Sequence, residues 1–165
     1  MTCPVCGRAN EPEARFCAAC GTRLARTSMA PEARKVVTVF FTDVAESTVL
    51  GEQLDPELLR RVMWRYFDVV QGVLERHGGT VEKFVGDAVM AVFGVPVVHE
   101  DDALRAVRAA AEIGDALRLL GDELAREHGI RLATRTGLNT GEVIVGGGAP
   151  DQKLATGDAV NVAAR

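Results

Sequence analysis

Four cysteines within the first twenty residues constrain most strongly what this chain of 165 residues can fold into. They form two Cys-x-x-Cys pairs, Cys3 with Cys6 and Cys17 with Cys20, and a glycine follows each pair. Each pair places two thiolates on one side of a tight turn, where the glycine lets backbone amides approach the sulfurs. Two such turns supply the four sulfurs of a tetrahedral structural zinc site. The spacing therefore predicts a zinc ribbon over residues 1–24.

The cysteine spacing alone leaves two other uses open. Two disulfides would suit an oxidising compartment, and a rubredoxin-like site would hold iron instead of zinc. A four-sulfur site has no open coordination position, so we expect this module to stabilise the protein or to dock a partner, and not to catalyse. Residues 1–35 carry six Lys or Arg against three Asp or Glu, which is weak support for nucleic acid as that partner.

A linker and a second domain follow the ribbon. Residues 25–34 contain a proline and show no apolar periodicity, which predicts the linker, and residues 35–165 form the domain. A β-branched and aromatic run over residues 36–41 predicts a strand buried on both faces. A helix should then begin after Asp55-Pro56 and end at Gly78-Gly79. It contains Trp64 and Tyr66, for which we expect packing in the core or at an interface.

The rest of the domain continues this alternation. Strands over residues 80–85 and 88–93 should form a hairpin that turns at Gly86-Asp87. A second long helix is expected over about residues 101–128, strands over 132–138 and 143–145, and another helix from Gly157. The apolar residues expected on the inner face of the second long helix are Leu104, Val107, Ala110, Ile113, Leu117, Leu120 and Leu124. The order β-α-β-β-α-β predicts an α+β fold of the ferredoxin-like kind, an antiparallel sheet with helices on one face.

Two aspartates and a lysine stand where this topology can bring them together. Asp43 follows the first predicted strand and Asp87 lies at the hairpin tip, so both can reach one edge of the sheet. Two carboxylates there can share two Mg²⁺ or Mn²⁺ ions, as two-metal phosphoryl transfer requires. Each aspartate alone has an ordinary interpretation, as a helix cap or a turn residue.

Three motifs together resemble the catalytic domain of the class III adenylate and guanylate cyclases. They are residues 40–48 (FFTDVAEST), residues 83–87 (KFVGD) with 90–94 (MAVFG), and residues 156–165 (TGDAVNVAAR). The resemblance covers about residues 35–165 and implies that Asp43 and Asp87 bind the two Mg²⁺ or Mn²⁺ ions, with the Val44 carbonyl as a further ligand. It also implies that backbone amides hold the phosphates at a helix start, which helix-end physics supports. These amides belong to Ala45, Glu46, Ser47 and Thr48.

The resemblance further implies the substrate and the dimeric form. Lys83 matches the lysine that reads adenine, and a lysine, which only donates, suits the bare ring nitrogen of adenine. Asn161 would orient the ribose and Arg165 would stabilise the pentavalent phosphate, from one face of a helix. In the family, two domains pack head to tail and share these residue sets, so a homodimer would form two composite sites.

The sequence departs from the family pattern at three places. Leu154 stands where a second purine-reading residue is usual, and nearby Thr156 can substitute for it. Glu142 replaces an arginine that holds phosphate in some members. The chain also stops at Arg165, before the last strands, and we expect it to be an incomplete catalytic domain with uncertain turnover.

The function expected from this resemblance is conversion of ATP to 3′,5′-cyclic AMP and pyrophosphate for intracellular signalling. The alternative is a catalytically weak or inactive nucleotide-sensing or dimerisation module, which passes a signal to downstream regulatory domains absent from this chain. No signal peptide begins the sequence, and the longest apolar run, residues 88–98, is short of the ~20 residues of a membrane span. With a net charge of −4, we expect a cytoplasmic protein without membrane or nucleic-acid partners.

Overall fold

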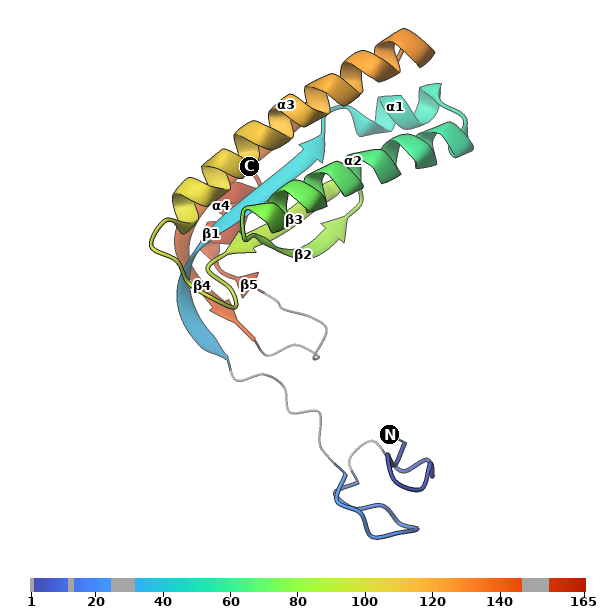
Figure 1. The fold of residues 1–165 in the computed structure, drawn as a ribbon, viewed down its shortest axis with the longest axis vertical. Helices are drawn as coiled ribbons and strands as arrows, with labels where there is room; N and C mark the ends of the chain where they lie inside the picture. The colour runs from blue at the N-terminus through green and yellow to red at the C-terminus, as the bar shows by residue number, and fades with distance from the viewer. Residues whose placement is uncertain (1, 12–13, 25–31, 147–154) are drawn as a thin grey trace.

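The computed structural model describes residues 2–11, 14–24, 32–146 and 155–165, and its main body is a curled sheet with two long helices laid across it (Figure 1). Along the chain, the strands and helices are β1 (Ala33–Val44), α1 (Ser47–Gln53), α2 (Pro56–Arg76), β2 (Thr80–Val85), β3 (Ala88–Phe93), α3 (Asp102–His128), β4 (Thr134–Val145), β5 (Ala155–Thr156) and α4 (Asp158–Ala163). The predicted α+β fold is confirmed.

The sheet has the order β2-β3-β1-β4-β5, and every pair of neighbouring strands is antiparallel. β1 is central and pairs along its whole length with β4, from Ala33 opposite Val145 to Val44 opposite Thr134. β1 begins at Ala33, inside the range predicted as linker, and residues 25–31 of that range lie outside the described residues. β4 is one strand, where the sequence predicted two.

The long helices α2 and α3 cover one face of the sheet and bury the larger of two apolar clusters against it. Asp55 caps α2 as predicted, and its carboxylate accepts a hydrogen bond from the Leu58 amide at 2.9 Å. Gly129 ends α3 with a φ of 70°, a conformation that glycine adopts without steric cost. Tyr66 is fully buried in this cluster, as expected. The apolar core thus fills the space between these helices and the sheet.

The inner face of α3 differs from the prediction in its first half. Leu104 and Val107 are about half exposed, and Ala106 and Ala109 are buried in their place. The buried set continues at helical spacing to Ile113, Leu117, Leu120 and Leu124, as predicted. Small side chains let the start of α3 lie close to the sheet, which the apolar periodicity of the sequence did not reveal.

The short helix α4 packs on the opposite face, so helices do not lie on one face alone. Its buried residues Ala159 and Ala163 join a second apolar cluster with Val37, Val39 and Met90 of the sheet. Two glycines of β4 make this close approach possible. A Cβ on Gly137 would overlap the carbonyl oxygen of Ala163, and one on Gly141 would come within 2.9 Å of the Ala159 Cβ.

None of the helices among the described residues is long and apolar enough to span a bilayer.

Candidate functional site

The two aspartates predicted from the sequence meet at the end of β1. Asp43 lies one residue before the end of that strand, and Asp87 lies in the turn between β2 and β3. The Asp87 Oδ2 accepts a hydrogen bond from the backbone amide of Val44, with 3.1 Å between oxygen and nitrogen. The hairpin turn is thereby fastened to the residue next to Asp43.

Arg135, which sequence reasoning missed, forms an ion pair with Asp43. It lies directly opposite Asp43 in the β1–β4 ladder, and its Nε and a terminal guanidinium nitrogen contact the two carboxylate oxygens at 3.0 and 2.9 Å. The hydrogen bond to Asp43 is the main cause that raises the pKa of Arg135, and the charge of Asp87 adds to it. The Arg135 guanidinium is therefore the counter-ion of Asp43 and also lies within the influence of the Asp87 charge. Ninety-two residues separate Asp43 and Arg135, so only the strand register reveals the pair.

The segment after Asp43 turns into α1, as expected for a helix start, but its amides are not all free. The Ala45 amide donates to the Ala133 carbonyl at 2.8 Å, so it is already engaged within the fold. Ala45 is therefore a poor phosphate donor, which corrects the prediction for that residue. Glu46 is in the left-handed conformation with a φ of 57°, and Ser47 and Thr48 begin α1.

Lys83 reaches the α4 face of the sheet because of a β-bulge in β2. Val81 pairs with Ala91 but Lys83 pairs with Met90, so the register shifts between them. Paired residues of an antiparallel ladder share a face, and Met90 in turn pairs with Phe41 of β1. Lys83 therefore lies on the same face of the sheet as Phe41. Asp43 shares this face, because it follows Phe41 by two positions along β1. Without the bulge it would share the α2 and α3 face with Val81.

A hollow of about 280 Å³ lies on that face beside Asp43. Its lining includes Thr42, Asp43, Arg135, Thr136, Gly137 and Arg165.

The remaining predicted site residues lie on or near α4 and β5. Helix α4 ends at Ala163, so Arg165 lies beyond the helix, whereas the sequence predicted it inside that helix. Asn161 and Thr156 are exposed on α4 and β5 and are not among the residues that line the hollow, and Leu154 lies outside the described residues. Glu142 pairs loosely with Arg34 at 3.4 Å.

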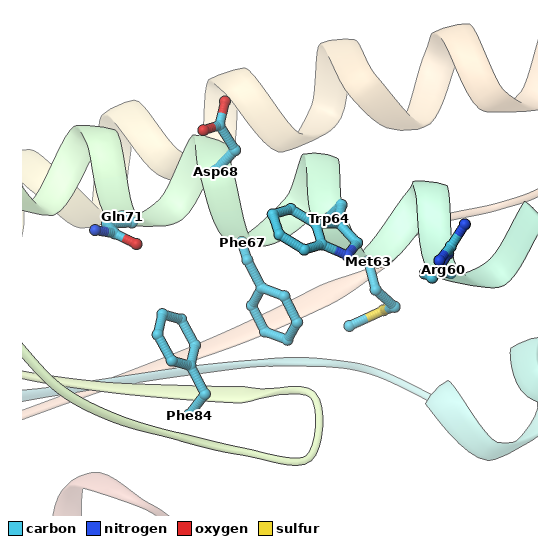
Figure 2. Close-up of a pocket in the computed structure, with 7 residues that line it drawn as sticks. All are labelled: Arg60, Met63, Trp64, Phe67, Asp68, Gln71 and Phe84. Carbon is cyan, nitrogen blue, oxygen red and sulfur yellow. The ribbon is translucent and has the colours of Figure 1, made fainter.

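A second, larger hollow of about 600 Å³ lies between α2 and the edge strand β2, and neither Asp43 nor Asp87 lines it (Figure 2). Trp64 stands at its rim and is 72 % exposed, so it is not a core residue. Phe67 and Phe84 meet edge to face below it, with 5.1 Å between ring centroids. Phe84 pairs with Val89, which faces the main core, so this groove opens on the face opposite to Asp43 and Lys83.

The four cysteines cluster as the spacing predicts. Their sulfur atoms all lie within 4.8 Å of one another, and all four are free thiols. The Gly7 and Gly21 amides donate to the Cys3 and Cys17 carbonyls at 3.0 and 2.9 Å, closing two equivalent turns. Amides of Cys20 and Ala19 direct their hydrogens at the Cys17 sulfur and lower its pKa to about 6. This four-thiol set fits a tetrahedral zinc ion and leaves no position for a substrate.

Comparison with known proteins agrees with both parts of the chain. The family of the adenylate and guanylate cyclase catalytic domain matches residues 29–165, and a zinc-ribbon domain family matches residues 2–24. Adenylate cyclase 1 of Rhizobium meliloti is 35% identical over 136 residues, which are 80% of this chain and 20% of that protein. The terminal-differentiation-specific adenylate cyclase of Dictyostelium discoideum is 30% identical over 134 residues, 79% of this chain and 6% of that one. The chain thus spans a quarter or less of these curated relatives.

Solved structures resemble the fold closely. The adenylyl cyclase CyaB from P. aeruginosa has a TM-score of 0.78 and 32% identity, and the match covers 82% of this chain and 72% of that one. The guanylyl cyclase Cya2 has a TM-score of 0.76 and 34% identity, covering 82% and 71%. The two neighbours differ in the base that their names indicate.

Proposed function

The chain belongs to the family of the adenylate and guanylate cyclase catalytic domain, and from this premise we propose that it converts ATP to 3′,5′-cyclic AMP and pyrophosphate. The observation that carries the proposal is the meeting of Asp43 and Asp87 at one end of β1, on the same face as Lys83. In the reaction, the ribose 3′-oxygen bonds to the α-phosphorus and the bond from that phosphorus to pyrophosphate breaks. The hydroxyl proton leaves to water.

The donor set at the end of β1 fits Mg²⁺ or Mn²⁺. Carboxylate oxygens are the ligands that hard divalent cations prefer, and the Asp43 side chain is about one-third exposed, so it is open to solvent. Asp43, Asp87 and the Val44 carbonyl would hold two such ions, which would supply charge stabilisation at the triphosphate and acidify the attacking hydroxyl. Glu46, Ser47 and Thr48 would present amides to the phosphates at the start of α1.

Lys83 supports ATP as the substrate. Its ammonium is an obligate donor, and adenine offers an acceptor nitrogen where guanine has a protonated one. The bulge places Lys83 on the same face of the sheet as Asp43, and a nucleotide would lie on this face. Thr156, exposed at the end of β5, would be a second contact to the base.

Asn161 and Arg165 complete the site from a second copy of the chain. Both are exposed on or just after α4, and they share the Asp43 face of the sheet. In a head-to-tail homodimer, the aspartates of one copy would face Lys83, Asn161 and Arg165 of the other. Asn161 would orient the ribose, and Arg165 would offset the charge that develops at the pentavalent phosphorus.

We also assign one structural zinc ion to Cys3, Cys6, Cys17 and Cys20. The convergence of four free thiols supports this assignment. Its role is to hold the ribbon together, because a small module whose apolar cluster, among the described residues, consists of Cys3, Cys17, Leu24 and Ala14 depends on such a ligand.

Product analysis by mass spectrometry tests the catalytic proposal. The purified chain is incubated with ATP or GTP and Mn²⁺, beside an Asp87→Asn variant as the matched control. We expect cyclic AMP with pyrophosphate from ATP, and no product from the variant. ATP binding without cyclic product in the wild type would reject the enzyme and favour the alternative below.

A nucleotide-sensing or dimerisation module is the second candidate function. The observation that favours it is the ion pair of Asp43 with Arg135, which engages both oxygens of a carboxylate needed for metal binding. In this alternative the chain binds ATP, or only dimerises, and signals without turnover.

A further inference from the structure

Arg135 places a positive charge beside the proposed metal ligands. Its guanidinium donates hydrogen bonds to both carboxylate oxygens of Asp43, at 3.0 and 2.9 Å, which is the geometry of a bidentate arginine–carboxylate pair. Asp87, tied to the neighbouring Val44 amide, lies near enough that its charge also acts on Arg135. Two carboxylates held near each other repel, so a positive group beside Asp43 stabilises the pair.

A divalent metal and this guanidinium compete for the same oxygens. A metal ion bound to Asp43 would use lone pairs of the same carboxylate oxygens to which the guanidinium nitrogens now donate. The metal ion and the guanidinium are both positively charged, so they would also repel each other when both are bound to one carboxylate. Their simultaneous binding to Asp43 is therefore unfavourable.

The side chain of Arg135 has the freedom to leave. It is 72% exposed, and an ion pair this open to water is weakly held. Beside it lies the hollow of about 280 Å³ that Thr136, Gly137 and Arg165 also line, which offers space for the displaced guanidinium.

We propose that Arg135 is a displaceable counter-cation that sets the metal affinity of the site: divalent cations bind Asp43 only as the guanidinium leaves it. This proposal rests on the proposed function, because it takes Asp43 and Asp87 as the metal ligands. Arg135 acts through Asp43, so it is a positioning residue.

Mn²⁺ binding, followed by electron paramagnetic resonance on the metal-free chain without nucleotide, tests the role of Arg135. Arg135→Gln removes the charge and shortens the side chain, and Arg135→Lys keeps the charge but loses the planar guanidinium that contacts both carboxylate oxygens. Arg34→Gln is the matched control, because Arg34 also pairs with a carboxylate across β1 and β4, that of Glu142, but at the far end of the ladder.

We expect Arg135→Gln to bind Mn²⁺ about fivefold to tenfold more tightly than the wild type, with Arg135→Lys between them and Arg34→Gln unchanged. Equal affinity of the wild type and Arg135→Gln would overturn the role of Arg135 while leaving the metal site in place. Absence of Mn²⁺ binding in all four proteins would overturn the metal site and this proposal together.

Discussion

Asp87 and Val44 are joined by a hydrogen bond of 3.1 Å, from the backbone amide of Val44 to the carboxylate of Asp87. The bond fixes the turn of the β2–β3 hairpin against the end of β1. It also leaves the other carboxylate oxygen of Asp87 available to a ligand. Asp87, which we propose as a metal ligand, thus also fixes the position of the hairpin turn that carries it.

This double role predicts that two substitutions of Asp87 will differ. Asp87→Asn keeps an oxygen that can accept from Val44 but loses the charge, so we expect stability to change by less than about 1 kcal/mol while cyclase activity falls about a hundredfold or more. Asp87→Ala leaves the Val44 amide without its partner and should cost about 1–3 kcal/mol as well. Urea unfolding and cyclic AMP assays separate the two effects. Equal stability of both variants would contradict the structural role of the bond.

Lys83 should determine the preference for adenine. Lys83→Glu replaces a donor by an acceptor, so we expect kcat/KM for ATP to fall about a hundredfold and the ratio of GTP to ATP turnover to rise. Lys35→Glu is the control, since Lys35 lies at the other end of β1 and donates to the Pro96 carbonyl. An unchanged ratio in Lys83→Glu would show that the lysine does not read the base.

Gly137 should tolerate no side chain, because a Cβ there would overlap the Ala163 carbonyl. We expect Gly137→Ala to destabilise the domain by about 2 kcal/mol and to displace α4, with a loss of activity through Asn161 and Arg165. Gly114→Ala is the matched control: it lies in α3, and the added Cβ would meet nothing within 4 Å beyond its chain neighbours and the nearby backbone of its own helix, so the change should be neutral or stabilising by up to about 1 kcal/mol. Similar denaturation midpoints for the two variants would contradict the close packing of α4.

The zinc ribbon should lose its metal as the pH falls. In the folded ribbon, amides of Cys20 and Ala19 lower the pKa of Cys17 from 9.0 to about 6. A lowered pKa stabilises the folded form fully above the unfolded value, and this contribution disappears as the pH falls through about 6. Because protons compete with zinc for the four thiolates, we expect one zinc ion per chain at pH 7.5, measured with a colorimetric chelator, and progressive release as the pH is lowered.

Cys17→Ser checks the same assignment at constant pH. The variant should lose the zinc while the melting temperature of the sheet domain stays unchanged. Zinc retained by this variant, or no zinc in the wild type, would contradict the four-cysteine site.

Much of the fold could be predicted because local signals agree with it. The β2–β3 hairpin occupies the predicted residues, since Gly86 adopts the positive φ that its turn requires. Asp55 and Gly129 mark helix ends by their own chemistry. The approach of Asp87 to the end of β1, next to Asp43, followed from topology, because the ends of neighbouring strands meet at one sheet edge.

Other features depend on contacts that no local pattern encodes. The sequence predicted a break between residues 138 and 143, whereas β4 runs through it, and its Gly137 and Gly141 serve the packing of α4. Helix α1 has seven residues and no side-chain cap, so no local pattern marked it, and only the family resemblance implied a helix start there. The bulge that turns Lys83 and the pairing of Arg135 with Asp43 are consequences of register between distant strands.

Mixing two inactive variants tests most directly whether this chain is an adenylate cyclase with a site shared between two copies. Asp87→Asn lacks one half of the proposed site and Arg165→Ala lacks the other, so each alone should form no cyclic AMP. In an equal mixture about half of the dimers would be heterodimers, and each heterodimer would have one intact site out of two. We therefore expect the mixture to form about a quarter as much cyclic AMP as the wild type. An inactive mixture beside an active wild type would contradict the shared site, and a wild type that forms no cyclic AMP would contradict the cyclase itself.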